Sequence, residues 1–256
     1  MMEQDKLIEK ERYEARAQFQ MAGAAVLADL ALGSQSMPAY LRTPYIFYEQ
    51  KIAELIRPSH RVLELGAGAG LHTLALLQTG AQVTASDISP NSLSLLKQRS
   101  QSTTDNLKTE VADMERLPFP AASFDVIVSA GSLSYGDPNL VDCEIRRVLR
   151  PGGMLICVDS LNHNPVYRTN RWLHYRRGNR SMSTLKRMPD LARIKALGDG
   201  FSNVSVHYFG ALSFAMPVLA RLLGENAAQA ASDRVDQLVG VKRSAFKFVL
   251  VAQGFA

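Results

Sequence analysis

The sequence predicts an α/β protein in which a parallel sheet is covered by helices on both faces. From residue 61 onwards, short apolar runs alternate with patterns typical of helices. The apolar runs are hydrophobic on both faces, as in parallel strands buried between two layers of helices. Hydrophobic residues make up 46% of the 256 residues and charged ones 21%, which excludes a disordered, collagen-like or coiled-coil chain.

Two helices are predicted before the alternating part. Residues 4–31 contain no proline and place apolar side chains at loosely helical spacing, which favours one long or broken amphipathic helix. Residues 33–44 are expected to form a loop. Residues 45–56 are expected to form a second helix that ends before Pro58.

The alternating part ends near residue 160, and a looser pattern follows it. The predicted strands are 61–65, 81–87, 107–113, 124–130, 154–160, 203–209 and 244–253. The predicted helices are 70–79, 90–101, 138–149, 184–197, 211–223 and 226–239. The chain contains no internal repeat, so the pattern indicates one core with insertions in its last third.

The positive charge of the chain is concentrated in one stretch. The formal net charge is +5. Residues 161–200 contain nine basic and two acidic residues, so this stretch carries +7 and the rest of the chain −2. A general affinity for nucleic acid would spread Lys and Arg over several elements or a whole face. We therefore expect no nucleic-acid partner and a role specific to this stretch.

The two cysteines, Cys143 and Cys157, are fourteen residues apart and belong to no CxxC motif. They predict neither a disulfide framework nor a metal site, but buried free thiols in a reducing compartment. The N-terminus lacks the apolar run of a signal peptide. The longest apolar stretch, residues 211–223, is shorter than the ~20 residues that span a bilayer, so we expect a cytoplasmic protein.

A glycine-rich turn follows the first predicted strand, where the sequence reads VLELGAGAG over residues 62–70. Glycine lets the backbone turn sharply and lets a ligand approach closely, and the next helix offers unpaired N–H groups. Asp87 ends the next strand, 23 residues after Glu64, where a carboxylate can accept both hydroxyls of a ribose. A helix cap or turn before Ser89 explains Asp87 equally well.

Asp113 and Met114 follow the third predicted strand. A carboxylate there can accept a hydrogen bond from the amine of adenine, and a methionine side chain can cover a face of the ring. Ordinary core packing explains Met114 equally well. The sequence thus predicts a nucleoside-binding edge at the ends of three successive strands.

Together these motifs resemble the S-adenosylmethionine-dependent class I methyltransferases, and most closely the type 11 methyltransferase domains, which include ubiquinone and menaquinone C-methyltransferases. The motifs are VLELGAGAG, Asp87, ADMERLPFPAASFDVIVSAGSLSY and VLRPGGMLICVD, in the order and spacing of the family. The resemblance implies a Rossmann-like sheet of seven strands in the order 3-2-1-4-5-7-6 with strand 7 antiparallel. It also implies S-adenosylmethionine as cofactor and S-adenosylhomocysteine as product. A nicotinamide-dependent dehydrogenase fits less well, because its fingerprint is GxGxxG.

The resemblance assigns nine residues to the cofactor, all near the ends of the first four strands. Those expected around its methionine part, including the amino group, are Glu64, Gly66, Ala67, Gly68 and Ser129. Those expected at its ribose and adenine are Asp87, Ile88, Asp113 and Met114.

Candidates for catalysis and acceptor binding lie after the fourth and fifth strands. Methyl transfer needs aligned reactants and, for a hydroxyl acceptor, a base. His163 is the candidate base, although a loop histidine bonded to backbone is the alternative; His72 has a weaker claim because it falls in a predicted helix. Tyr135 and Tyr167 are candidates to line the acceptor pocket.

Members of the family recruit acceptors with an N-terminal extension and with insertions after strands 5 and 6. We therefore interpret residues 1–57 as a helical extension or lid and residues 58–256 as the core, with substrate-side insertions at 161–185 and 210–243. The apolar start of the second insertion is an acceptor-pocket wall, a homodimer contact or a weak membrane-surface element, with burial in the core as the default.

The insertion 161–185 coincides with the basic stretch. Arg176 and Arg177 are candidates to bind a phosphate or carboxylate of the acceptor, and a solvated charged helix is the alternative. We expect O-methylation of a small sugar or natural-product acceptor with anionic or amphipathic character. C-methylation of a quinone-like or lipid-linked acceptor is the first alternative, and a non-catalytic cofactor-binding scaffold is the second.

Overall fold

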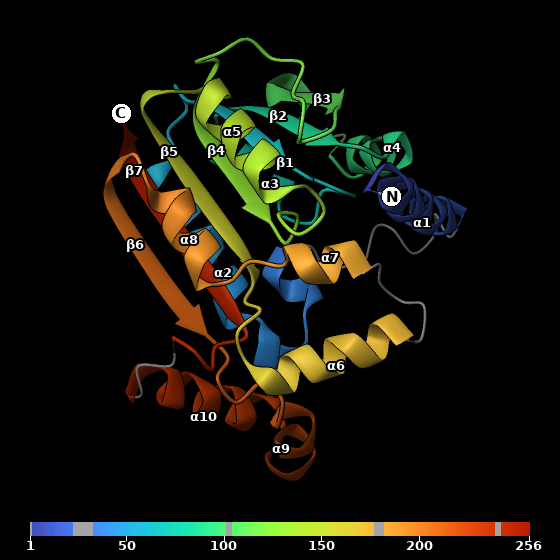
Figure 1. The fold of residues 1–256 in the computed structure, drawn as a ribbon, viewed down its shortest axis with the longest axis vertical. Helices are drawn as coiled ribbons and strands as arrows, with labels where there is room; N and C mark the ends of the chain where they lie inside the picture. Colours follow the sequence, from blue (N-terminus) through green and yellow to red (C-terminus); the bar gives the residue numbers. More distant parts are fainter. Residues whose placement is uncertain (1, 23–32, 101–103, 177–181, 239–241) are drawn as a thin grey trace.

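The computed structural model describes residues 2–22, 33–100, 104–176, 182–238 and 242–256, and in this part of the chain seven strands form one mixed sheet (Figure 1). The strands are β1 (Arg61–Leu65), β2 (Gln82–Asp87), β3 (Leu107–Val111), β4 (Phe124–Ala130), β5 (Leu149–Ser160), β6 (Phe201–Phe209) and β7 (Lys247–Phe255). Their order is β3-β2-β1-β4-β5-β7-β6, which confirms the predicted order.

The strands β1 to β5 run parallel, and β7 is antiparallel to both of its neighbours, as predicted. Parallel strands end at the same edge of a sheet. The segments that follow β1, β2, β3 and β4 therefore meet at one edge, where ligands bind in open α/β folds.

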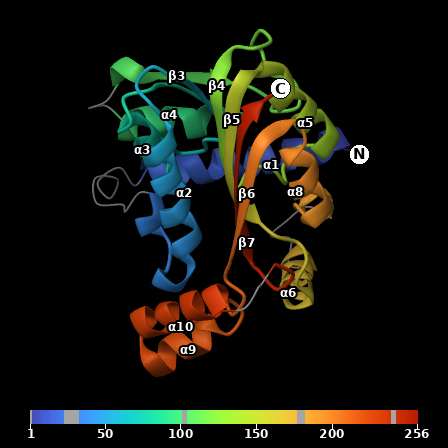
Figure 2. The same ribbon diagram turned by 90° about the vertical axis from the view of Figure 1, so that its left-hand side faces the viewer.

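Helices cover both faces of the sheet (Figure 2). One face carries α2 (Thr43–Leu55), α3 (Thr73–Leu77) and α4 (Pro90–Arg99), and the other carries α5 (Pro138–Val148) and α8 (Leu191–Gly198). Successive residues of a strand point to opposite faces. Accordingly, Val62 packs in the core beneath α2 with Ile52, whereas Leu63 packs in the core beneath α5 with Ile145.

The remaining helices lie around the ends of the sheet. They are α1 (Met2–Ala22), α6 (Pro165–Arg176), α7 (Met182–Arg187), α9 (Met216–Leu223) and α10 (Glu225–Leu238), with short 3₁₀ turns η2 (Gly33–Ser36), η3 (Ala39–Leu41) and η4 (Thr104–Asn106). Helix α1 packs beside α4. Helices α9 and α10 pack on each other at the end of the molecule away from β3, close to α6 (Figures 1 and 2).

The helices predicted over 184–197 and 4–31 are two of those that differ from the observed ones. The helix predicted over 184–197 is divided into α7 and α8, because Pro189 lacks an N–H and the side chain of Asp190 accepts from the Arg193 N–H to begin a new helix. The helix predicted over 4–31 is described to Ala22, and its remainder lies outside the described residues.

The thiols differ in exposure, which corrects the expectation that both are buried. Cys157 is buried in β5, whereas Cys143 is exposed on the outer side of α5. No set of three or more His, Cys, Asp or Glu side chains within the described ranges is arranged to hold a metal ion. Over the same ranges, no helix has both the length and the apolar character needed to cross a bilayer.

Candidate functional site

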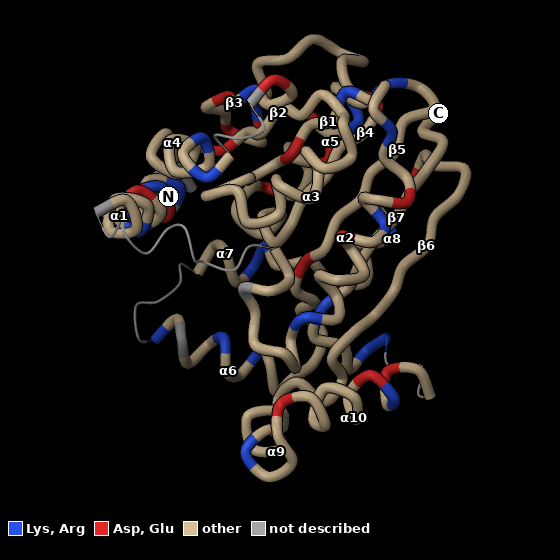
Figure 3. Tube along the Cα trace, turned by 180° about the vertical axis from the view of Figure 1, so that it is seen from behind, with Lys and Arg blue, Asp and Glu red and all other residues tan. Residues whose placement is uncertain are grey.

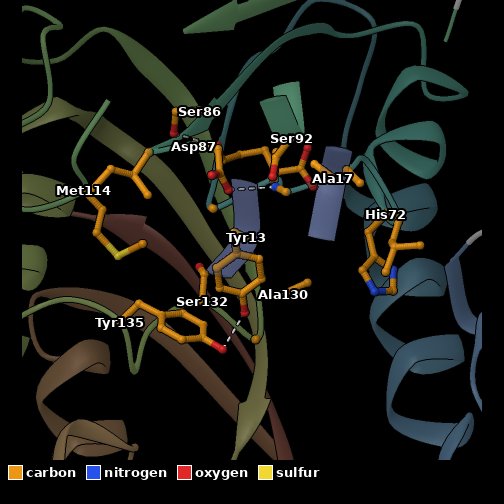
Figure 4. Close-up of a pocket in the computed structure, with 18 of the residues that line it drawn as sticks. Tyr13, Ala17, His72, Ser86, Asp87, Ser92, Met114, Ala130, Ser132 and Tyr135 are labelled. Atoms are coloured by element: carbon orange, nitrogen blue, oxygen red, sulfur yellow. Dashed lines mark hydrogen bonds between the residues drawn. The ribbon is translucent and has the colours of Figure 1, made fainter. Parts of the chain in front are cut away.

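A cavity of about 510 Å³ lies at the edge where the parallel strands end (Figure 4). Its size falls within the roughly 300–1,000 Å³ of small-molecule sites. Its lining comes from the strand ends, from α1 and from the segments around α2. The strand ends contribute Glu64, Gly66, Ala67, Gly68, Asp87, Ile88, Asp113, Met114, Gly131, Ser132 and Tyr135. The fold thus brings all but one of the nine predicted cofactor residues to one cavity.

The glycine turn after β1 forms the floor of the cavity. Gly66 has a φ of 66°, and a Cβ on it would overlap the side chain of Ser132, so the turn is packed tightly against the loop after β4. Gly68 has a φ of 54°, and a Cβ on it would meet no protein atom within 4 Å. A side chain at Gly68 would therefore fill the space that a ligand needs. Gly70 abuts Leu96 of α4 and does not line the cavity.

Glu64 is a buried carboxyl group at the cavity end of β1. Burial raises its pKa to about 7. The hydrogen bond that Thr73 Oγ1 donates at 2.7 Å lowers the pKa but does not offset the effect of burial. The charge of Asp87 adds to the rise. A cationic group in the cavity would favour the ionised form of Glu64, so the site suits the ammonium end of an amino acid.

Asp87 connects the turns after β1 and β2. One carboxylate oxygen accepts from the Gly68 N–H and the other from the Ser89 N–H, both at 2.8 Å. Burial raises the pKa of Asp87, and these backbone hydrogen bonds oppose the rise. Each carboxylate oxygen has a further lone pair, so the group can still accept from ribose hydroxyls.

Asp113 is paired with Lys6 of α1. The Lys6 Nζ lies 2.7 Å from Asp113 Oδ2 and also contacts the carboxylate of Glu115. Burial alone would lower the pKa of Lys6, but the two carboxylates outweigh it and raise this pKa. Met114 lines the cavity and also packs against the core beneath α5, so its position is compatible with either of its predicted roles.

One face of α1 covers the cavity. The α1 residues that line it recur at helical spacing: Lys6, Glu9, Tyr13, Arg16, Ala17 and Gln20. The Tyr13 hydroxyl donates to the Tyr135 hydroxyl at 2.6 Å (Figure 4). Sequence reasoning predicted a lid but missed these residues, because charged side chains on an amphipathic helix ordinarily face water.

The loop after β4, which carries Tyr135, is held from two sides. Asp159 of β5 accepts from the Leu133 N–H at 3.0 Å, and Arg193 of α8 donates to the Leu133 carbonyl at 3.0 Å. Arg187 of α7 donates to the Tyr135 carbonyl at 3.2 Å. Two members of the basic stretch are therefore buried and fix the cavity wall. Burial raises the pKa of Tyr135, and the adjacent Tyr13 adds to the rise.

His72, which had a weaker claim than His163 in the sequence analysis of candidate bases, lies in the cavity wall. Its Nδ1 is 3.0 Å from Glu49 Oε1, and Glu49 also accepts from the Ser34 N–H at 2.8 Å. The imidazole stacks on Tyr45, with ring centroids 5.1 Å apart and an interplanar angle of 6°. The helix after the glycine turn begins at Thr73 rather than at residue 70, which leaves His72 in the turn that borders the cavity.

Three predicted residues lie elsewhere. Ser129 is buried within β4, where its hydroxyl is 2.7 Å from that of Ser132, and the cavity begins one residue later. His163 does not line the cavity. The Tyr167 hydroxyl donates to the Gly210 carbonyl at 2.9 Å and accepts from the Phe214 N–H at 3.0 Å, so it joins α6 to the segment before α9 instead of lining the cavity.

Arg176, one of the two predicted anion-binding arginines, also lies away from the cavity. Arg176 is exposed at the end of α6, with its guanidinium 5.2 Å from the centre of the Trp172 ring. Arg177 lies outside the described residues. Within the described ranges, no basic residue of the 161–200 stretch lines the cavity.

Comparison with known proteins gives relatives of this region. A family model described as "Methyltransferase domain" matches residues 63–157. The chain is 35% identical over 131 residues to the sterol 4-C-methyltransferase strm-1 of Caenorhabditis elegans (49% of this chain, 39% of the relative). It is 37% identical over 120 residues to a demethylmenaquinone methyltransferase of Mycobacterium sp. (strain KMS) (44% and 48%). The chain thus spans less than half the length of these curated relatives.

Solved structures share the fold at low sequence identity. Geranyl diphosphate methyltransferase, solved with GPP and sinefungin, has a TM-score of 0.57 and 17% identity, covering 84% of this chain and 80% of that one. The [4+2]-cyclase SpnF has a TM-score of 0.55 and 20% identity, covering 81% and 80%. At these identities the likeness shows the fold alone. The family model thus shows that residues 63–157 are similar to methyltransferase domains, and the fold of the chain is one that such domains adopt.

Proposed function

We propose that the protein transfers the methyl group of S-adenosylmethionine to a carbon of a lipophilic, ring-containing acceptor. The observation that carries the proposal is the convergence of Glu64, the glycine turn, Asp87, Asp113 and Met114 on one cavity. When bound, the cofactor supplies an electrophilic methyl group on a sulfonium. The protein's own residues have to hold the two reactants in line and exclude water.

The residues fit the cofactor part by part. Glu64 suits its ammonium group, the open side of Gly68 leaves room for it, and Asp87 offers carboxylate oxygens to its ribose. Asp113 and Met114 suit the amine and the ring face of its adenine. Ser129, which was expected at the amino group of the cofactor, does not line the cavity. Gly131 does line it, so the backbone of Gly131 takes this role in the proposal.

The relatives support a carbon of a lipophilic acceptor over the oxygen of a sugar. Their names include a sterol 4-C-methyltransferase, demethylmenaquinone methyltransferases and a 2-methyl-6-phytyl-1,4-hydroquinone methyltransferase. Aliphatic and aromatic side chains of Met37, Tyr45 and Leu71 contribute to the wall near His72. The expected anionic character has less support, since the described part of the basic stretch contributes nothing to the cavity lining.

We propose that His72 takes up the proton that the acceptor loses when its carbon is methylated. With Glu49 accepting from Nδ1–H, the opposite ring nitrogen carries a lone pair and has no hydrogen-bond partner among the described residues. Figure 4 shows His72 on the side of the cavity away from Met114, and therefore away from the proposed adenine end. His163 lacks this support because it does not line the cavity.

The test is a pair of measurements on the full chain. Calorimetric titration with S-adenosylmethionine and S-adenosylhomocysteine should show binding that Asp87→Ala abolishes. Incubation with labelled cofactor and a demethylmenaquinol, a phytylhydroquinone or a sterol should then transfer label to one of these acceptors. Absence of cofactor binding by the folded protein would falsify the proposal. Binding without turnover would favour the alternative of a non-catalytic cofactor-binding scaffold. A cyclase shares this fold, so the fold by itself does not imply methyl transfer.

A further inference from the structure

The segment at the start of the second insertion turns apolar side chains towards solvent. Val218 and Leu222 are four residues apart in α9 and are 62% and 75% exposed, and Phe214, in the turn before the helix, is 50% exposed. Residues four apart lie on one face of a helix. The buried residue of α9 is Met216, and α10 packs on its other side. Helix α9 therefore has an apolar face that no described residue covers, which departs from the expected burial in the core.

Helix α6 has a similar outer face. Val166, Trp172 and Leu173 are 48%, 47% and 42% exposed, whereas Tyr167 and Arg171 are buried against the body of the protein. Tyr167 joins the two helices through its hydrogen bond with the Phe214 N–H and its edge contact with the Phe214 ring at 6.3 Å. The two apolar faces thus belong to neighbouring elements at one end of the molecule (Figures 1 and 2).

The charges of this end are arranged by sign. Every formally charged side chain of α6 and α9 is an arginine, coloured blue in Figure 3. Arg168, Arg176 and Arg221 are exposed. The acidic side chains of α10 accept hydrogen bonds from the body of the protein. They are Glu225 (from the Ala39 N–H), Asp233 (from Thr43 Oγ1) and Asp236 (from the Gly210 and Ala211 N–H groups). The exposed apolar residues are therefore flanked by positive charge.

We propose that α6 and residues 214–223, here called the docking face, bind the surface of an anionic lipid bilayer. Apolar side chains of Trp172, Phe214 and Leu222 enter the headgroup region, and the exposed arginines pair with lipid phosphates. The Arg176–Trp172 pair has the composition of side chains enriched at bilayer interfaces. A two-fold contact with a second copy fits less well, because it would bring these arginines against their own equivalents.

The docking face is connected to the cavity. The hydrogen bonds of α10 to Ala39 and Thr43 place this end of the molecule next to the start of α2, and Tyr45, two residues later, lines the cavity. If the proposed function holds, a lipophilic acceptor would pass from the bilayer to the cavity along this side. The docking itself rests only on the exposed residues.

Trp172 is the one tryptophan of the chain and lies on the docking face, so its fluorescence reports directly on docking. With the full chain and vesicles of phosphatidylcholine plus phosphatidylglycerol, we expect a blue shift and quenching by brominated lipid chains. Vesicles of phosphatidylcholine alone should bind at least tenfold more weakly, since each exposed arginine contributes about fivefold at an anionic surface. An unchanged spectrum with both vesicle types would overturn the proposal.

Variants separate docking from a general change of the protein. Leu222→Ser should weaken binding to the anionic vesicles about tenfold, whereas Leu140→Ser, on the exposed side of α5, should leave it unchanged. Arg176→Glu should weaken it, whereas Lys195→Glu on α8 should not. Equal losses of vesicle binding in the control variants would contradict the docking face. A dimer in sedimentation, together with a Trp172 fluorescence spectrum typical of a buried side chain, would also contradict it. Cofactor binding is expected to stay normal throughout, so failure of docking and failure of the proposed function are distinguishable.

Discussion

The imidazole of His72 owes its orientation to two other segments. Glu49 of α2 fixes Nδ1, and the Ser34 N–H in turn fixes Glu49. Burial alone would raise the pKa of Glu49, but the hydrogen bonds from His72 and Ser34 lower it, so the carboxylate is kept ionised beside the ring. Under the proposed function, the other nitrogen of this cavity-lining imidazole accepts the proton.

We predict that His72→Gln lowers kcat about 100-fold or more, because a positioned base contributes at least that much to proton transfer. Glu49→Gln should lower kcat about tenfold by releasing the ring. The double variant should be no slower than His72→Gln alone, since the two groups act as one unit. Steady-state kinetics and calorimetry check this, with Glu54→Gln, an exposed carboxyl on the same helix, as control. A loss of cofactor affinity that matches the loss of kcat would contradict the assignment.

Glu64 makes the stability of the ligand-free protein depend on pH. Its pKa is raised from 4.5 to about 7, so the folded state keeps a proton that the unfolded chain loses between these values. The stabilisation from this group is present below pH 4.5 and is lost as the pH rises through 7. We predict that the Tm falls between pH 5 and pH 8 and that Glu64→Gln flattens this dependence. In thermal scans, an unaltered slope in Glu64→Gln, or the same flattening in the exposed Glu110→Gln, would refute it.

Residue-level prediction succeeded where a motif fixes the backbone and failed in irregular segments. The glycine turn, Asp87 and Asp113 lie together at the predicted edge of the sheet, because each stands at or just after the end of a parallel strand. Arg176 was expected to bind an acceptor but is exposed away from the cavity, whereas Arg187 and Arg193, which had no predicted role, donate to carbonyls of the loop after β4. A charge count does not distinguish an inward guanidinium from an exposed one, because both depend on tertiary contacts.

At the scale of elements, we propose that α1, which lines the cavity, controls access to it. Its ion pair with Asp113 and its tyrosine contact with the loop after β4 connect it to both walls. We predict that Lys6→Met combined with Tyr13→Phe speeds the release of S-adenosylmethionine about tenfold, because both contacts have to break before the cofactor leaves. Stopped-flow displacement checks this, with Lys10→Met, which does not line the cavity, as control. Release rates equal to those of the unmodified protein would rule out the covering role.

The elements themselves were predictable to different degrees. The strands β1 and β4 were predicted to the residue, because each is an apolar run bounded by turn residues. The break between α7 and α8 was missed although Pro189 marks it, because the apolar spacing continues through the proline. The helix predicted from residue 211 begins at Met216, since residues 211–215 form turns that are tied to Asp236 and Tyr167.

At the scale of the molecule, the basic stretch has two parts with different roles. The buried Arg187 and Arg193 fix the cavity wall, whereas the exposed Arg168 and Arg176 lie on the docking face with α9. The fold could be predicted as a whole because its motifs occur in order over residues 45–160. The acceptor could not, because the segments that would select it, α1, α6 and α9, carry no motif and acquire their roles only through packing.

The central claim is methyl transfer to a carbon of a lipophilic ring. The full chain is incubated with anionic vesicles that contain the acceptor and with S-adenosylmethionine that carries a deuterated methyl group. The acceptor is then analysed by mass spectrometry. We expect one deuterated methyl group on a ring carbon, in an amount that His72→Gln reduces about 100-fold. A label on oxygen, or an unlabelled acceptor with cofactor bound, would contradict it.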